Sequence, residues 1–220
     1  MRKPTPLPRP RQGMPFAVTT AVGMGVGRGR LRGADLVIPF RGTRPSSSEA
    51  PTVTLVAETY ASRRPGHQAF SHRTAAALLG LRLPEGRNGQ RAAQPGLDEA
   101  VMAPHRAPRR LGVRGHEIQS SVVIATLTNG LRVTSPIDTL IQLASELSVD
   151  DLIVMGDGLV SRNSPHATVH ELVPAVGRSA NRTGTARLRE ALPWIRARTD
   201  SARETLLRLM IVRGASRSGR

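Results

Sequence analysis

The sequence predicts an α+β protein with an N-terminal winged helix-turn-helix-like module, a small antiparallel sheet packed with helices, and C-terminal helices. Within residues 133–160, apolar side chains recur at the i, i+3, i+4, i+7 spacing of a helix with one buried face. The pair Asn129-Gly130 between two apolar segments is a strong signal for a tight hairpin. Residues 16–45 show the order helix, turn, helix, strand. These three observations define the predicted fold class.

Two consecutive helices are predicted at the centre of the chain, because two capping patterns follow each other closely. Ser135 precedes Pro136 and is followed three residues later by Asp138, which is a capping box with proline at the first helical position. Ser148 and Asp151 repeat the pattern. We expect the two helices to pack antiparallel or at a steep angle and to form the core.

The predicted sheet precedes these helices. Its strands are expected at Leu97–Met102, Leu111–Ile118, Val122–Leu127 and Leu131–Thr134. The first two are predicted to be joined by a basic turn, which carries Arg106, Arg109, Arg110 and Arg114. This turn is either a contact for a polyanion or a solvated hairpin tip.

Further helices are indicated by the apolar spacing of Val53–Ala61 and by caps along the chain. Ser71 is expected to cap a helix that closes at Gly80. Thr168 and Glu171 form another capping box, and a last helix is predicted from Asp200-Ser201 onward. We expect the final residues, RGASRSGR, to be a tail that does not pack.

The N-terminal module is the candidate DNA reader. Its second helix would present Arg28, Arg30 and Arg32, and a strand at 37–40 would form a wing with arginines at its tip. Those wing residues are Arg41 and Arg44. The alternative is a basic, solvated helix pair, since each of the glycines in this stretch lowers helix stability by about 1 kcal/mol relative to alanine.

The predicted organisation has five parts. They are a disordered basic arm at 1–15, the winged-helix-like module at 16–45, an α+β domain at 51–160, a helical segment at 165–198, and residues 199–220.

Charge is distributed unevenly along the 220 residues, whose formal net charge is +16. Residues 1–115 hold 19 basic and 6 acidic residues, 116–171 hold 2 and 7, and 172–220 hold 11 and 3. Basic flanks around an acidic centre indicate either polyanion contact or docking of the parts on one another. Except for Lys3, all the basic residues other than histidine are arginine, a bias that a GC-rich coding sequence also produces.

Composition excludes several classes of protein. The chain has no cysteine, hence no disulfide framework and no thiol nucleophile. Its longest apolar runs are too short to span a bilayer, and its N-terminus lacks the apolar region of a secretory signal. We therefore expect a cytoplasmic protein that makes no membrane contact.

No catalytic constellation stands out. The six histidines form no i, i+4 pair within one helix, and no strained Gly-x-Ser-x-Gly elbow is present. Asp150 and Asp151 fall in a helix first turn, where carboxylates favour the helix dipole without a metal, and Asp157 follows. We expect no cofactor and no metal site.

Several stretches together resemble an actinobacterial family of AbiEi-type antitoxin-like proteins. They are GRGRLRGADLVIPFRGTR, FSHRTAAALLGLRLP, HRAPRRLGVRGHEI, LRVTSPIDTLIQLASELSVDDLIVMGDGLVSR and DSARETLLRLMIVRGA. Members of that family often carry a C-terminal domain similar to the very-short-patch-repair endonuclease, of the PD-(D/E)XK class. The resemblance implies an N-terminal DNA-binding module, and it matches Glu204 to the first-helix glutamate of the nuclease fold. It further implies that 199–220 are a stub of that domain, truncated before the later carboxylates of a metal site.

Two classes of function follow. The first is a DNA-binding, antitoxin-like regulator without nuclease activity, in which Arg28, Arg30, Arg32, Arg41 and Arg44 contact phosphate, with Arg109 and Arg110 as further contacts. The second is a protein-interaction module that neutralises a partner toxin through an acidic face at Asp150, Asp151 and Asp157. A remnant of an endonuclease is a third alternative.

Overall fold

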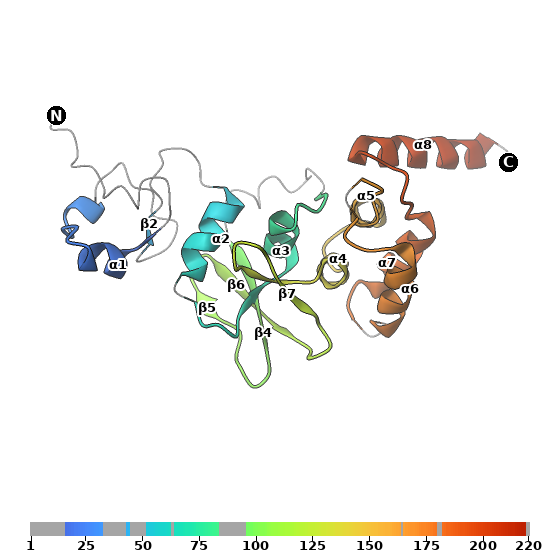
Figure 1. Ribbon diagram of the computed structural model, residues 1–220. Coiled ribbons are helices and arrows are strands. Elements are labelled where there is room, and N and C mark those ends of the chain that lie inside the picture. The colour runs from blue at the N-terminus through green and yellow to red at the C-terminus, as the bar shows by residue number, and fades with distance from the viewer. Residues whose placement is uncertain are drawn as a thin grey trace, which may run out of the picture.

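The computed structural model describes residues 16–32, 43–44, 52–62, 64–83, 96–163, 165–179 and 182–218. Helices and strands combine in an α+β fold, as the sequence predicts. The strands are β1 (Phe16–Ala17), β2 (Thr43–Arg44), β3 (Ala69–Phe70), β4 (Leu97–Met102), β5 (Arg109–Arg110), β6 (Val113–Ile118), β7 (Ile124–Thr126) and β8 (Arg132–Thr134). The α-helices are α1 (Val18–Gly23), α2 (Val53–Ala61), α3 (His72–Leu78), α4 (Pro136–Leu143), α5 (Val149–Leu159), α6 (Val169–Arg178), α7 (Thr185–Ala191) and α8 (Ala202–Ser218). Two 3-10 helices, η2 (Arg30–Arg32) and η3 (Leu192–Trp194), complete the described elements (Figure 1).

The main sheet has six strands in the order β5-β6-β4-β3-β8-β7. It is mixed, because β4 pairs with β6 and β3 pairs with β8 in parallel, whereas the other neighbours are antiparallel. The prediction of an antiparallel sheet is therefore wrong for the pairs β4–β6 and β3–β8. The predicted strand 111–118 begins instead at Val113, because the chain reverses at Leu111–Gly112 after the short strand β5. That reversal turns β6 back into the direction of β4.

The predicted hairpin around Asn129-Gly130 is confirmed. β7 and β8 pair antiparallel, with Ala125 opposite Val133. Gly130 has a φ of +79°, a left-handed conformation that glycine adopts without a steric penalty. The side chain of Asn129 accepts a hydrogen bond from the Leu131 backbone amide at 3.3 Å, which closes the turn.

Helices α2 and α3 lie on one side of the sheet (Figure 1). Val56, Ala57 and Tyr60 of α2 join Phe70 and Val133 of the sheet in one buried apolar cluster. The cap of α2 is the Thr52 hydroxyl, which accepts from the Leu55 amide at 3.2 Å. These contacts confirm the helix predicted at 53–61.

Helix α3 starts after Ser71 and is followed by Gly80 at φ +65°, as the sequence predicts. Ser71 does not cap the helix with its hydroxyl, however. That hydroxyl lies 3.1 Å from His72 Nδ1 instead, because His72 has an unusual φ of +46° that turns its ring back toward Ser71.

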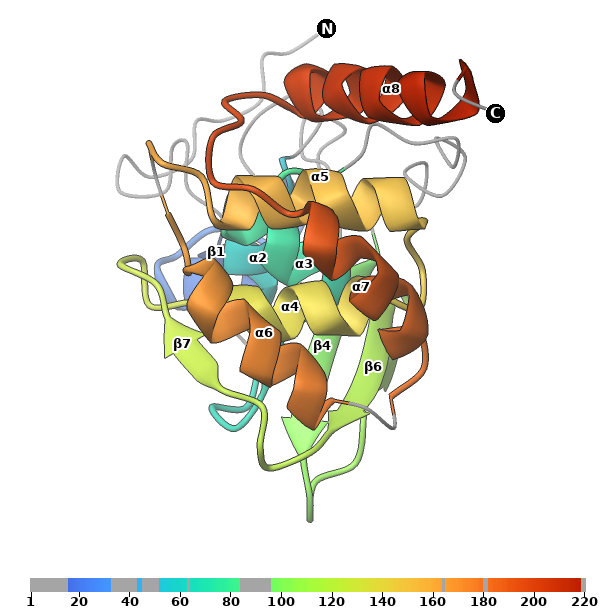
Figure 2. The ribbon, with the colours of Figure 1, turned by 90° about the vertical axis from the view of Figure 1, so that its right-hand side faces the viewer.

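The two central helices form as predicted. Ser135 Oγ accepts from the Asp138 amide at the start of α4, and Ser148 and Asp151 make a full capping box at the start of α5. Both helices contribute fully buried leucines to a second, larger apolar cluster. Figure 2 shows α4, α6 and α7 in front of the sheet, with α5 above α4.

The helical segment predicted at 165–198 corresponds to α6, α7 and η3. Its first helix begins at the predicted box of Thr168 and Glu171, in which each side chain bonds the backbone amide of the other. Gly184, with a φ of +86°, precedes α7, and a Cβ built there would lie 2.3 Å from the backbone of Ala144. Only glycine fits where α7 approaches the end of α4 this closely.

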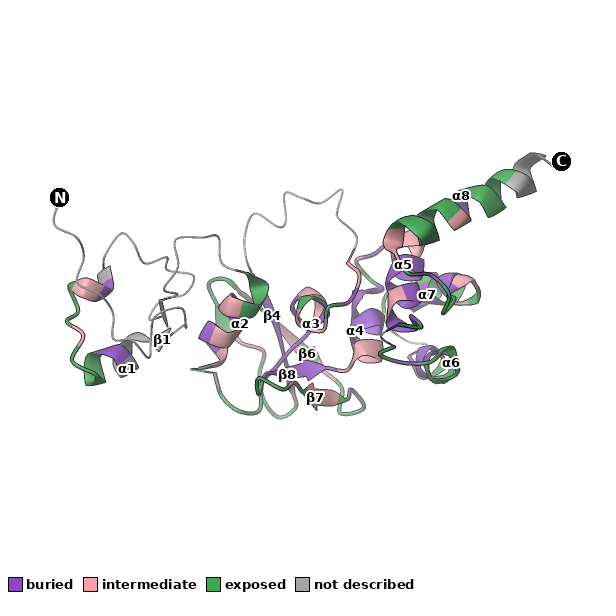
Figure 3. Ribbon diagram, turned by 45° about the horizontal axis from the view of Figure 1, so that its top comes forward, coloured by how far each residue is buried: buried purple, intermediate pink, exposed green. Residues whose placement is uncertain are grey.

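Helix α8 docks on α5 through Thr205 and Leu209, which are buried. It runs on to Ser218, so most of the predicted C-terminal tail is helical. Lack of packing side chains does not end a helix, because each further residue adds a backbone hydrogen bond. Figure 3 shows that most of α8 is exposed. Among the described helices, none combines the length and apolar character required to cross a membrane.

The N-terminal module is described in part. β1 and β2 form a two-stranded ladder with Phe16 opposite Arg44, and α1 follows β1 directly. The predicted second helix is represented by the short η2. The predicted wing strand at 37–40 lies outside the described residues, so the winged-helix hypothesis stays a prediction.

Candidate nucleic-acid interface

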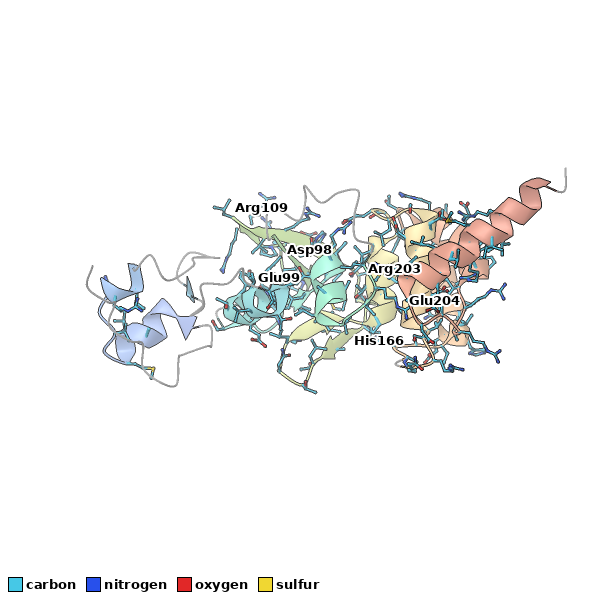
Figure 4. The ribbon with its side chains drawn as sticks, turned by 90° about the horizontal axis from the view of Figure 1, so that it is seen from above. Asp98, Glu99, Arg109, His166, Arg203 and Glu204 are labelled. Atoms are coloured by element: carbon cyan, nitrogen blue, oxygen red, sulfur yellow. The ribbon has the colours of Figure 1, made fainter. Side chains whose placement is uncertain are left out.

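A two-stranded basic ribbon lies at the edge of the main sheet. β5 and β6 pair with Arg109 opposite Arg114 and Arg110 opposite Val113, and the chain turns at Leu111–Gly112. Arg109 and Arg110 are exposed. In Figure 4, Arg109 lies at the margin of the molecule, away from the labelled acidic residues Asp98 and Glu99.

The positive charge of the ribbon is only partly neutralised. No ion pair within 4.0 Å joins Arg109 or Arg110 to another described residue, although the Arg110 charge counteracts the burial that raises the pKa of Glu99. Arg114 Nη1 lies 3.7 Å from a carboxylate oxygen of Asp98 and 3.8 Å from one of Glu146, and its side chain is 52% exposed. Arginines directly opposite each other on paired strands destabilise a ribbon. Placing Arg109 opposite Arg114 therefore does not stabilise the free protein.

The ribbon is tightly anchored to the sheet. The carbonyl of Gly112 accepts a hydrogen bond from the Leu97 amide of β4 at 2.8 Å. A Cβ built on Gly115 would lie 2.4 Å from the carbonyl oxygen of Pro108, so that glycine permits the segment before β5 to lie against β6. These contacts hold the arginines in a preorganised geometry.

A polar cluster lies behind the ribbon on β4, β6 and α3. His116 Nε2 is 3.0 Å from a carboxylate oxygen of the buried Asp98. The His116 ring stacks on that of His72 with centroids 3.8 Å apart. Burial, with the neighbouring His116 adding to it, lowers the pKa of His72 to about 4. At neutral pH His72 is uncharged and contributes ring contacts rather than charge.

A second buried network surrounds Glu99, whose side chain is fully inaccessible to solvent. Tyr60 Oη donates to Glu99 at 2.6 Å, and Arg64 Nη1 lies 3.5 Å from the same carboxylate. The Arg64 guanidinium also stacks over the Phe70 ring at 4.3 Å. Burial raises the pKa of Glu99, and the hydrogen bond from Tyr60 and the nearby Arg64 charge act in the opposite direction. Because no substrate reaches a fully buried carboxylate, this network supports α2 against the sheet.

The other predicted DNA contacts lie on a separate stretch of chain. Arg28 is exposed and Arg30 is half-buried at the start of η2. Arg32 ends η2 and Arg44 lies in β2, although their side chains are not among the described ones. Arg41 lies outside the described residues. Of the predicted contacts, Arg109 and Arg110 are consecutive residues of β5, and their side chains point to opposite faces of the ribbon.

Glu204, matched by the resemblance to a nuclease glutamate, acts as a helix cap. Its carboxylate accepts from the Asp200 amide at 2.9 Å and from Ser201 Oγ at 3.0 Å, at the start of α8. The backbone hydrogen bond from Asp200, followed by that from Ser201, lowers the pKa of Glu204. It lies on the surface beside Arg203 (Figure 4). Within the described part of the chain, no three His, Asp or Glu side chains gather closely enough to hold a metal ion.

The three aspartates of the proposed acidic face are engaged within the chain. Asp157 is fully buried and accepts from Arg208, Thr205 and the Arg196 amide. Asp150 forms a two-point ion pair with Arg213, and Asp151 belongs to the capping box of α5. These carboxylates hold α5 and α8 together and cap α5, so they do not form a free face for a partner.

A groove of about 620 Å³ lies between α4, α6 and the β6–β7 connection. Its lining combines the apolar Ile137, Ile141 and Ala175 with the cationic Arg178 and Arg182. The carboxylates at its rim, Asp138 and Glu171, are already used as helix caps.

Sequence reasoning missed the networks of Asp98 and Glu99. Both residues lie in the strand predicted at Leu97–Met102, and no local pattern in that segment indicates that their carboxylates are buried. The combination of His72 after a helix cap and His116 in a strand offered the only signal, and their contact depends on tertiary structure.

No family model matches the sequence, and no curated protein matches it. Among solved structures, the fold is similar to the crystal structure of the RV2827C protein from Mycobacterium tuberculosis, with a TM-score of 0.47 and 18% sequence identity. The alignment covers 82% of this chain and 71% of that one.

Proposed function

We propose that this protein binds DNA through the β5–β6 ribbon. The observation that carries the proposal is the pair of exposed arginines, Arg109 and Arg110, held on an anchored ribbon with no ion-pair partner among the described residues. Guanidinium groups donate two parallel hydrogen bonds to phosphate oxygens, which suits them to nucleic-acid backbones. The net charge of +16 adds a long-range attraction to a polyanion.

A regulatory, antitoxin-like role is part of the proposal and is supported by the family resemblance of the sequence. In this role Arg28 and Arg30 of the N-terminal module add phosphate contacts to those of the ribbon. Cleavage of DNA is not proposed, because the one residue matched to the nuclease fold, Glu204, uses both carboxylate oxygens to cap α8.

The test is the salt dependence of DNA affinity. We expect a fluorescein-labelled 20-base-pair duplex to bind in an anisotropy titration, with affinity that falls steeply between 50 and 200 mM KCl, concentrations at which phosphate contacts are strongly screened. Each phosphate contact makes the slope of log K against log salt more negative by about 0.9. Replacing both Arg109 and Arg110 by alanine should therefore make the slope less negative by about 2.

The matched control removes the same charge elsewhere. Arg178 in α6 and Arg189 in α7 are exposed arginines on helices outside the β5–β6 ribbon. The double variant R178A/R189A should keep the wild-type slope. Equal slopes for the two double variants, or no duplex binding by the wild type at 50 mM KCl, would contradict the proposal.

A further inference from the structure

The tip of the basic ribbon carries an apolar side chain with no apolar neighbour to cover it. Leu111 is 99% exposed, the highest exposure of any large hydrophobic residue in the described part of the chain. It directly follows Arg110 in the turn between β5 and β6. Isolated surface leucines are common, but this one stands at the outermost point of the candidate DNA interface.

The turn holds Leu111 in a fixed position. Gly112 has a φ of +78°, a left-handed conformation suited to glycine, and its carbonyl accepts from the Leu97 amide of β4. On the other side, Pro108 lies against Gly115 at a distance that leaves no room for a Cβ. These contacts fix the backbone of the turn, and a preorganised backbone lowers the entropic cost of binding.

Arginines surround this leucine on both strands. Arg109 and Arg114 are opposite each other across the ribbon, and Arg110 is next to the turn. Proteins that bind the minor groove combine arginines, which are attracted to its negative potential, with an apolar wedge inserted between base pairs. A leucine is one of the residues that serve as such wedges.

We propose that the β5–β6 ribbon enters the minor groove of duplex DNA and that Leu111 inserts at a base step, bending the duplex. This inference rests on the proposed function, since it specifies how the same ribbon binds DNA. Arg109, Arg110 and Arg114 contact the flanking phosphates or the groove walls. A pyrimidine–purine step such as TA is the preferred site, because it unstacks most readily.

An anionic membrane surface is the other partner that a basic, leucine-tipped turn suggests. The structure favours DNA, because a single fatty-acyl chain gives only marginal membrane binding and one leucine buries less apolar surface than such a chain. Among the described residues, no exposed apolar cluster stands beside Leu111: the residues before it are Arg109 and Arg110, and Val113 opposite Arg110 packs against the core.

The experiment measures duplex bending and affinity separately. A 30-base-pair duplex with a central TA step and a fluorophore pair at its ends reports bending by energy transfer, and anisotropy gives the affinity at several KCl concentrations. The variants are L111A, L111F, and L207A as the matched control, since Leu207 is 58% exposed on α8. Leu111 makes no buried contact, so its replacement should leave the circular dichroism spectrum unchanged.

We expect the wild type, L111F and L207A to raise energy transfer on binding. L111A should leave the duplex straight and bind about tenfold more weakly, with the same slope of log K against log salt. Equal bending by L111A and the wild type would overturn the wedge while leaving DNA binding intact, as would binding without bending by the wild type. Leu111-dependent binding to phosphatidylserine vesicles, tighter than to the duplex, would assign the tip to a membrane. Absence of any duplex binding would instead overturn the proposed function itself.

Discussion

Two aspartates of α5 form ion pairs with arginines of α8, and they differ in burial and in the further hydrogen bonds that Asp157 accepts from Thr205 and the Arg196 amide. Asp157 is inaccessible to solvent, and its partner Arg208 is 22% exposed. Asp150 is 42% exposed and its partner Arg213 is 44% exposed. The variants D157N and D150N therefore remove the same charge from the same helix in two environments, while keeping the shape of the side chain.

We expect D157N to weaken the docking of α8 by about 3 kcal/mol, the lower end of the range for breaking a buried ion pair. The lower end applies because Arg208 retains some contact with water. The change also removes the charge from the acceptor of Thr205 Oγ1, which lies 2.8 Å away. We expect D150N to cost at most about 1 kcal/mol, because an exposed pair is screened by solvent.

Hydrogen exchange measured by mass spectrometry separates the two effects. In D157N, exchange of the α8 amides around Thr205 and Leu209 should accelerate by about 100-fold, as the free-energy change implies. In D150N the same amides should change by less than about tenfold. Equal acceleration in the two variants would refute the argument that burial decides the strength of these contacts.

Three further predictions concern the interior. The pKa of His72 is lowered to about 4, below the ordinary 6.5. Between these two pH values the His72 imidazole is protonated in the unfolded state but not in the native state. The free energy of unfolding from urea titrations should then fall as the pH drops from 6.5 to 4. In H72N, whose asparagine tolerates the positive φ, this free energy should depend less on pH. The same pH dependence in H72N and the wild type would contradict a lowered pKa of His72. The variant Y60F removes a buried hydrogen bond to Glu99 and should lower the urea-derived free energy of unfolding by about 1.5–3 kcal/mol, whereas a loss below 0.5 kcal/mol would show that the bond contributes little. G184A should lower the melting temperature, since it places a Cβ against the backbone at the end of α4, while the control G177A, which meets open space within a helix, should not.

Local sequence signals predicted most of the helices and their starts. The capping boxes at Ser148 and Thr168 and the turn at Gly130 depend on neighbouring residues alone, and each was predicted and confirmed. The end of α8 was placed too early, because the tail was judged by its lack of packing side chains. Helix propagation needs only backbone hydrogen bonds, so the helix continues.

The sheet topology depended on contacts that no local pattern reports. β4 and β6 are close in sequence, and adjacent strands usually form hairpins. Here the two-residue strand β5 takes the antiparallel position, which makes β4 and β6 parallel neighbours. The short length of β5 and the turn at Gly112 determine this arrangement. In the sequence, the segment that forms β5 and the turn could not be distinguished from a basic loop.

The candidate interface was predicted in part. Arg109 and Arg110 were named from their charge and their place in a basic turn, and the structure adds that they are exposed and anchored. The apolar tip at Leu111 was assigned instead to the following strand. Leu111 is exposed because it lies in the turn, after β5 ends and before β6 begins.

The most direct test of the account is a map of the surface that DNA protects. Hydrogen exchange of the wild-type protein should be compared with and without saturating 20-base-pair duplex at 50 mM KCl. We expect slower exchange across residues 106–114, with α6 and α7 unchanged. Protection confined to other elements, with unchanged exchange at 106–114, would contradict the claim that the β5–β6 ribbon binds DNA.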